Sequence, residues 1–205
     1  MPKVSEEHKE QRRTNLLEAA AEVFIEHGFE KTTMKLVMDK AGVSRGGLYH
    51  YFDNKEDLFE AVIEEQQSEI LDGSIHTMIT QQDSYWDALL MTFLGDDKEP
   101  DDEMDPLAPS KIEYFITGRT DKRRQESAQQ RYIKAFEMTT KIIVEGEKAG
   151  EFTPRFDNQI IAKSIITYID GLAVGHSLLD SKNIQLKAQT ELLIEYLKWV
   201  LNVKQ

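Results

Sequence analysis

Apolar residues recur at helical spacing along most of this chain. In the first block, Leu16, Ala20, Val23 and Phe24 occupy positions i, i+4, i+7 and i+8, which places them on one face of a helix. We find no convincing period-two run of the kind that a half-buried strand produces. The pattern therefore predicts an all-α fold and argues against sheet-based architectures.

Turn residues and caps divide the chain into successive helical blocks. Gly28 follows the first block, where a left-handed cap is expected. An acidic segment, 95–109, with three prolines is expected to be a solvated linker. We expect a head at residues 1–60, with a connecting helix to about residue 72, and a larger body at 61–205. The expected helices cover about residues 7–27, 33–40, 45–51, 54–71, 85–94, 111–117, 123–148, 158–179 and 186–203.

Composition narrows the classes of function. The 205 residues carry a formal net charge of −12 and include no cysteine, which excludes a disulfide framework, a thiolate metal site and a cysteine nucleophile. The five histidines lack metal-ligand spacing, and we find no nucleophile elbow, phosphate loop or acid–base pair. We therefore expect that the protein is not an enzyme and that it binds neither a cofactor nor a metal ion. Without a secretory signal or a spanning helix, the chain is expected to be cytoplasmic, with no membrane partner.

Residues 33–55 have the pattern of a helix-turn-helix. Either Thr32 or Thr33 can cap the first short helix with its side-chain hydroxyl, and Ser44 can cap the second. Gly42 allows the sharp turn between the two helices. The second helix begins with small and polar residues, which can approach a DNA groove closely. Residues 31–55 hold five basic and two acidic residues, so this segment carries +3 and the other 180 residues carry −15. Arg12 and Arg13 add to this patch if the first helix begins near the DNA backbone.

The chain resembles the N-terminal domain of TetR-family transcriptional regulators over about residues 10–65. The resemblance is carried by Leu16-Leu17-Glu18-Ala19-Ala20, Phe24, Gly28-Phe29, Thr32-Thr33-Met34, Ala41-Gly42-Val43-Ser44-Arg45-Gly46-Gly47-Leu48-Tyr49-His50-Tyr51-Phe52 and Lys55-Glu56-Asp57-Leu58. It implies a homodimer that binds double-stranded operator DNA, with a three-helix head and a helical body that binds a small effector. Two positions depart from the family pattern: Met38 replaces a small alanine, and Gly47 replaces threonine, alanine or serine.

The resemblance and the charge pattern together suggest which residues contact DNA. Thr33, Tyr49 and Lys55 are implied to contact the backbone, while Arg45 is the best candidate for reading a base, because its fork matches guanine O6 and N7. Tyr49 and His50 are implied to face phosphates or base edges. The full expected set is Thr33, Lys35, Ser44, Arg45, Gly46, Tyr49, His50 and Lys55.

The body is rich in large, adaptable side chains, several with polar tips. This composition suits an apolar cavity for a largely apolar or aromatic effector, although core packing is the ordinary interpretation of each residue alone. The expected effector residues are Trp86, Phe93, Tyr114, Phe115, Tyr132, Phe136, Tyr168 and His176. Arg119, Arg123 and Arg124 could serve an anionic ligand or form a solvated helix start.

The pattern of the last two helices predicts that two copies of the chain associate. The final helix carries two apolar stripes, Leu193-Leu197-Val200 and Leu192-Tyr196-Trp199, and a helix that is apolar on two faces must bury both. We expect a two-fold, four-helix interface that includes Leu172, Gly175, Leu193, Tyr196 and Val200.

These observations predict a homodimeric repressor that binds a palindromic operator and is released by a small effector. The alternative is a helical protein-interaction module whose DNA-binding head is degenerate.

Overall fold

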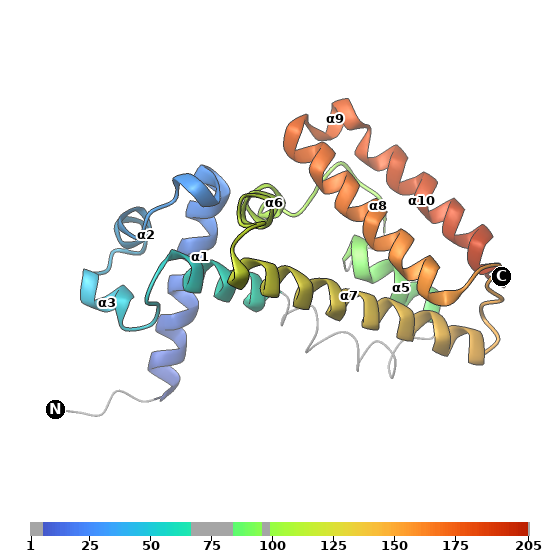
Figure 1. Cartoon of the computed structure of the whole chain (residues 1–205), viewed down its shortest axis with the longest axis horizontal. Coiled ribbons are helices and arrows are strands. Elements are labelled where there is room, and N and C mark those ends of the chain that lie inside the picture. Colours follow the sequence, from blue (N-terminus) through green and yellow to red (C-terminus); the bar gives the residue numbers. More distant parts are fainter. Residues whose placement is uncertain (1–5, 67–83, 96–98, 205) are drawn as a thin grey trace.

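The computed structural model describes residues 6–66, 84–95 and 99–204, and every regular element in those ranges is a helix (Figure 1). The bounds are α1 Glu6–Lys31, α2 Met34–Ala41, α3 Arg45–Tyr49, helix 55–66, α5 Tyr85–Leu94, α6 Ala108–Thr117, α7 Lys122–Lys148, α8 Asn158–Leu178, α9 Ser181–Ile184 and α10 Leu186–Leu201. The all-α prediction is confirmed. The expected extension of the fourth helix beyond residue 66 lies outside the described residues.

The head packs α1, α2, α3 and helix 55–66 around one apolar cluster. Val37 and Leu48 are fully buried and hold α2 and α3 together. The rings of Phe24 and Phe59 meet edge-on, with their centroids 4.5 Å apart, a favourable aromatic geometry. Met38 is half-buried against the same cluster, so the head accommodates the larger side chain at that position.

Helix α1 contains a break at Gly28. This residue has φ 76° and ψ 170°, a conformation that glycine adopts without a Cβ clash. The expectation of a positive φ is confirmed, but the ψ value lies outside the left-handed helical region. A Cβ at Gly28 would lie 2.7 Å from Glu113 Oε2 of α6, so the glycine also permits α6 to approach.

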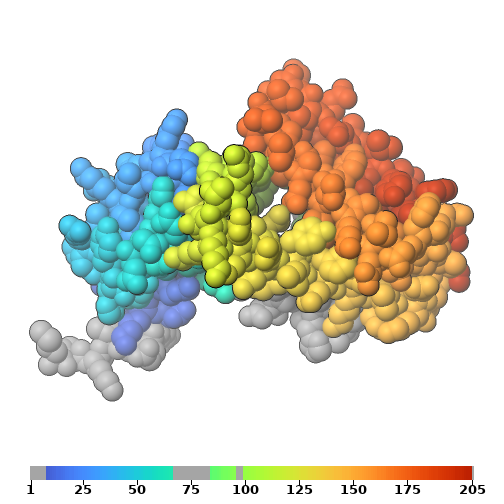
Figure 2. Space-filling view, in the orientation of Figure 1, coloured from blue at the N-terminus to red at the C-terminus, as the bar shows by residue number. Residues whose placement is uncertain are grey.

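The body is organised along α7, which runs from the head to the far end of the molecule (Figure 1). Helices α5 and α8 pack on α7, and α10 completes a core whose members include Leu89, Ile143, Ile161 and Leu197. Figure 1 shows α8 and α10 running side by side, at the end of the molecule opposite α3. In the space-filling view, the body and the head form two masses that meet at α6 and the start of α7 (Figure 2). The body thus places one pair of helices on its outer side, away from the helix-turn-helix.

The short helix α9 was not expected from the sequence. Asp180 caps it by accepting a hydrogen bond from the Asn183 amide at 2.7 Å, and Gln185 ends it with φ 54°. One helical turn contains too few residues to display an apolar period, which explains why the pattern indicated only a connection there.

Candidate DNA-binding surface and effector cavities

The turn of the helix-turn-helix is held by two caps and a glycine. Thr33 Oγ1 accepts a hydrogen bond from the Leu36 amide at 3.3 Å, and Ser44 Oγ accepts one from the Gly47 amide at 3.3 Å. Gly42 has φ 65° and ψ 32°, in the left-handed region that favours glycine. These local contacts confirm both predicted caps and the predicted turn.

Helix α3 lies at the end of the head away from the body (Figure 1), and its polar side chains, Arg45 and Tyr49, are exposed. The Arg45 guanidinium lies 5.3 Å from the centroid of the Tyr49 ring, which is 37% exposed. His50 is exposed and meets the Tyr51 ring edge-on. Seven of the eight expected DNA-binding residues are exposed, namely Thr33, Lys35, Ser44, Arg45, Gly46, Tyr49 and His50. Their contact with DNA stays a prediction.

Lys55 differs from the other seven because its ammonium already has protein partners. Lys55 Nζ donates to the carbonyl oxygens of Phe29 at 2.7 Å and Glu30 at 3.2 Å, and it lies 4.2 Å from the centroid of the Phe29 ring. Two of its three hydrogens therefore satisfy carbonyls at the end of α1. The structure gives Lys55 a role in holding the end of α1 to helix 55–66, and a phosphate contact stays a prediction for it.

The positive patch is narrower than the count of charges suggests. Lys40 is ion-paired with Glu22, and this hydrogen bond raises the pKa of Lys40. With Lys55 also engaged, the basic side chains of residues 31–55 that are exposed and have no ion pair with another described residue are Lys31, Lys35 and Arg45. Two of these lie within the helix-turn-helix, so the positive charge is concentrated beside α3.

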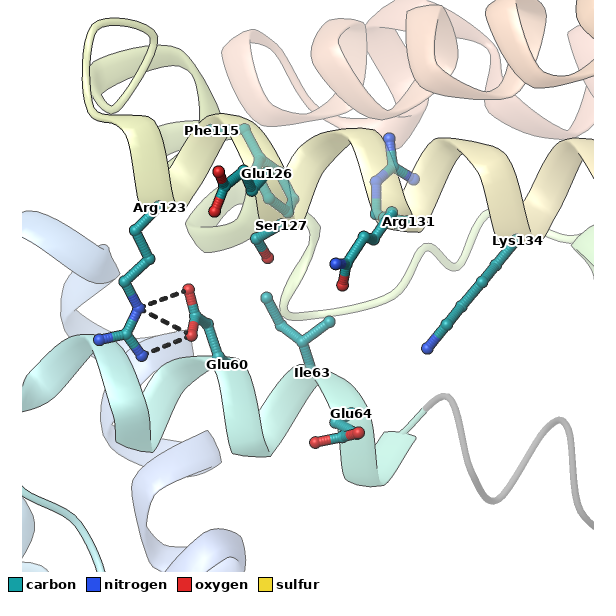
Figure 3. A pocket seen from close by; sticks show the side chains of 10 residues that line it. Glu60, Ile63, Glu64, Phe115, Arg123, Glu126, Ser127, Arg131 and Lys134 are labelled. Atoms are coloured by element: carbon teal, nitrogen blue, oxygen red, sulfur yellow. Dashed lines mark hydrogen bonds and ion pairs between the residues drawn. The ribbon is translucent and has the colours of Figure 1, made fainter.

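Two arginines at the start of α7 connect the body to the head. Arg123 Nη2 lies 2.6 Å from Glu60 Oε2 of helix 55–66 (Figure 3). It also lies 2.5 Å from Oδ1 of Asp57, on the same helix. These contacts raise the pKa of Arg123, first through its hydrogen bond to Glu60 and also through that to Asp57. Helix 55–66 leads out of the head, so this cluster joins the DNA-binding unit to α7.

Arg124 is the more buried of the two arginines at this contact between the head and α7, which we call the junction. Its guanidinium carbon lies 4.6 Å from the Phe29 ring centroid and 4.8 Å from that of Tyr114. Its Nη2 lies 3.0 Å from Glu56 Oε1, and only 14% of its side chain is exposed. The guanidinium is thus held between aromatic faces and a carboxylate, an arrangement that suits arginine and not lysine.

Tyr114 belongs to this junction and not to an effector cavity. Its side chain is fully buried among Phe29, Phe59 and Phe115, and its hydroxyl donates to Glu60 Oε1 at 2.5 Å. Burial, followed by the bond to Glu60, raises the pKa of Tyr114 well above its usual range. The expectation that Tyr114 contacts an effector is therefore wrong, because the packed rings leave it no accessible surface.

A cavity of about 290 Å³ lies beside the junction, between helix 55–66, α6 and α7 (Figure 3). Ile63 and Phe115 supply its apolar wall, and Lys134 extends from α7 on one side. Arg131 also lines it, with Nη2 3.2 Å from Asp170 Oδ1. Its Nε is buried and has no hydrogen-bond partner among the described residues. The cavity therefore combines an apolar wall with polar and charged groups.

The other expected effector residues are distributed over several sites. Phe93 lines a cavity of about 80 Å³ near α10, and Tyr168 lines a groove of about 640 Å³ between α8 and α9. Tyr132 and Phe136 stack with their ring centroids 6.4 Å apart. Trp86 packs partly buried in the body core, and His176 has a buried Nδ1 without a hydrogen-bond partner. Among the described residues, these side chains form no single site.

Two of the expected interface residues face the protomer's own core. Leu193 is 2% exposed and Val200 is 0% exposed, so the expectation that they meet a partner is wrong. The reason is the register of α10: this stripe packs on α5, α7 and α8, and the other stripe points outward. Leu172 is also buried, Gly175 lines the groove beside Ile184, and Tyr196 is exposed. Of the five expected interface residues, Tyr196 is the one whose side chain is exposed to solvent.

The junction residues were the main functional feature that the sequence did not indicate. Glu56, Asp57 and Glu60 recur on one side of a helix, and Arg123 and Arg124 are adjacent in sequence. The two groups are more than 60 positions apart, so nothing local pairs them. Within the described ranges, no three His, Asp or Glu side chains are placed to hold a metal ion, and no helix is long and apolar enough to cross a membrane.

Comparisons with known proteins agree with this architecture. Residues 16–62 match the family model of bacterial regulatory proteins of the tetR family, and residues 90–187 match that of the tetracyclin repressor-like C-terminal domain. The chain is 34% identical over 208 residues to YfiR of Bacillus subtilis (strain 168), described as an uncharacterized HTH-type transcriptional regulator, with 100% of this chain and 98% of YfiR covered.

Two solved structures share the fold. Salmonella enterica GusR aligns with a TM-score of 0.71 and 22% identity, over 97% of this chain and 98% of GusR. FadR of Bacillus subtilis, solved in complex with stearoyl-CoA, aligns with a TM-score of 0.66 and 19% identity, over 93% of this chain and 99% of FadR. The fold and the exposed α3 surface define an all-α, helix-turn-helix DNA-binding protein. The chain belongs to the TetR family of transcriptional regulators, which are ligand-responsive.

Proposed function

We propose that this protein is a homodimeric repressor that binds a palindromic operator and is released by a small, largely apolar effector. The observation that carries the proposal is the separation of two exposed surfaces. The polar face of α3 lies at one end of the molecule, and an apolar stripe of α10 lies at the other (Figure 1). A two-fold contact through α10 would present two copies of α3 to one duplex.

The outer stripe of α10 supports the dimer. Leu192 is 64% exposed, Tyr196 is 42% exposed and Trp199 is 53% exposed. Ile160 and Val174 of the neighbouring α8 are 58% and 37% exposed. Exposed large apolar side chains on two neighbouring helices favour a protein interface, and α8 and α10 from two subunits would form a four-helix contact.

The exposed α3 residues support recognition of DNA. In a dimer, the two α3 helices would enter major grooves about 34–36 Å apart, one helical turn of the duplex. Arg45 would read a guanine through its two-pronged donor set, and Thr33 and Lys35 would contact phosphates. The exposed, basic α3 surface favours this function over a protein-interaction module with a degenerate head.

The cavity beside the junction supports release by an effector. Ile63 and Phe115 offer an apolar wall within the same pocket as Arg123, whose ion pairs hold helix 55–66 (Figure 3). A ligand that fits the cavity better in one head position would shift the population toward that position. Operator affinity would then fall because the two α3 helices no longer match the groove spacing.

Genomic footprinting with purified protein tests this function. We expect protection of a palindromic site whose half-sites are centred about 10 base pairs, or a multiple of a turn, apart. Sedimentation at the same concentration should give a dimer. A footprint without sequence preference, or single subunits at concentrations that protect DNA, would overturn the proposal.

The effector is tested separately by thermal shift with compounds related to the genes beside the footprint. Largely apolar or aromatic compounds should raise the unfolding temperature and weaken operator binding together. A screen in which only small polar ions bind would contradict the effector class and leave the DNA-binding function standing.

A further inference from the structure

A groove of about 650 Å³ separates the first turns of α1 from α3. Lys9, Arg12 and His50 are among the nine residues that line it, and none of the nine is acidic. The chain as a whole carries −12, so the lining of this groove is opposite in charge to the chain as a whole. Its chemistry favours an anion.

Two adjacent arginines on α1 have different surroundings. Arg13 Nη1 lies 3.2 Å from Glu65 Oε2, and this ion pair ties α1 to helix 55–66. Arg12 is exposed and has no ion pair with a carboxylate of the described chain. Arg13 is therefore engaged with a carboxylate and does not line the groove, whereas the Arg12 guanidinium lies at the groove.

Gly47 creates the space that the Arg12 side chain occupies. A Cβ built at Gly47 would lie 3.3 Å from Arg12 Nη2, whereas a Cβ at Gly46 would meet nothing within 4 Å. The Arg12 guanidinium thus lies against α3, at the position where residue 47 has no side chain. A long side chain at 47 would fill this part of the groove and displace Arg12.

We propose that this groove binds a phosphate of the operator backbone, with Arg12 as the charged ligand and Gly47 as the residue that opens the groove. The guanidinium can donate two parallel hydrogen bonds to phosphate oxygens. Helix α1 then contributes a DNA contact beside those of α2 and α3. This inference rests on the proposed DNA-binding function.

Fluorescence-anisotropy titrations of the full-length protein at several salt concentrations test the phosphate contact. The probes are a random-sequence duplex and the duplex recovered by footprinting, because a backbone contact acts on both. Arg12→Ala should reduce the slope of log affinity against log salt by about 0.9 for each phosphate that is no longer neutralised, on both duplexes. Arg13→Ala is the matched control and should leave the slope unchanged.

The role of Gly47 is tested by Gly47→Leu in the wild-type and Arg12→Ala backgrounds. With Arg12 present, Gly47→Leu should lower the salt slope as much as Arg12→Ala does; with Ala at position 12 it should lower it no further. Equal reductions from Gly47→Leu in both backgrounds would show a direct clash with DNA and overturn the coupling.

The results of these titrations distinguish failure of the Arg12 phosphate site from failure of the proposed DNA-binding function. If Arg12→Ala keeps the wild-type slope while the wild-type protein binds the footprinted duplex selectively, the phosphate site is wrong and the regulator stands. If the wild-type protein binds neither duplex, both are wrong. Circular dichroism of each variant confirms that its helical content is retained.

Discussion

The hydrophobic cores of the head and the body differ in which parts of the chain supply their residues. The body core is built from residues 88–201, all within the body itself. The head core includes Leu107 and Tyr114, which come from α6 and the residue before it and follow the rest of the cluster by more than 40 positions. The head is therefore completed by a body element, and a movement of α6 changes the surroundings of Phe29 and Phe59.

The contact between head and body and the proposed dimer contact also differ in chemistry. The contact between head and body combines ion pairs with ring stacking around Arg123 and Arg124. The outer face of α10 is apolar. The ion pairs of Arg123 are partly exposed, and pairs of this kind contribute little and can exchange partners. The free energy of apolar burial, in contrast, is given up only when the surfaces separate. This difference suits a permanent dimer whose heads can move.

The largest effect is expected from Tyr114→Ala. Removing a fully buried ring from a packed aromatic cluster leaves a cavity and should lower the free energy of unfolding by about 3–5 kcal/mol. Urea denaturation measures this change. Tyr132→Ala, at a 36% exposed ring of α7, is the control and should cost far less.

Tyr114→Phe sharpens the same test. It keeps the ring and removes only the hydrogen bond to Glu60, so it should cost about 1 kcal/mol. A destabilisation by Tyr114→Ala no larger than that by Tyr114→Phe would mean that α6 does not complete the head core.

The dimer contact should respond next. Trp199→Ala removes the largest exposed aromatic of the outer α10 stripe and should weaken dimerisation by about 2 kcal/mol, close to thirtyfold in Kd. Analytical ultracentrifugation measures the constant. Trp86→Ala, in the body core of the same chain, should destabilise the fold and leave the dimerisation constant of the folded protein unchanged. The reverse pattern would move the interface away from α10.

Local signals were sufficient to predict most of the fold. Caps such as Thr33 and Ser44 and turn residues such as Gly42 act within a few positions, so helix bounds could be inferred closely. The register of α10 was resolved only in part, because Leu193 and Leu192 are equally apolar and the sequence does not say which stripe faces the core. Side chains were predicted least well where their partners are distant in sequence, as for Lys55 with Phe29 and Arg124 with Glu56.

A moderate effect is expected from Arg124→Gln. The substitution removes the positive charge from between two rings and from Glu56, and it should lower the free energy of unfolding by about 1–2 kcal/mol. Hydrogen exchange should increase most in the head and less in the body core. Arg119→Gln, at an exposed neighbouring position, is the control, and equal effects from the two variants would show that Arg124 acts only through its general charge.

The smallest effect concerns the pH dependence of the junction. The pKa of Glu30 lies below its ordinary value of 4.5, first because of the hydrogen bond from Thr117 at 2.7 Å and then because of the charges of Lys55 and Arg124, against an opposing effect of burial. A lowered carboxylate pKa contributes stability that is present above pH 4.5 and is lost as the pH falls through the folded-state pKa. Thr117→Val should therefore reduce the free energy of unfolding at neutral pH, with a difference from wild type that shrinks in acid. Thr120→Val, at an exposed position in the next turn, should show no such pH dependence, and a Thr117→Val difference that stays constant from neutral to acidic pH would assign its effect to packing and to the bond with the Glu113 carbonyl instead of to Glu30.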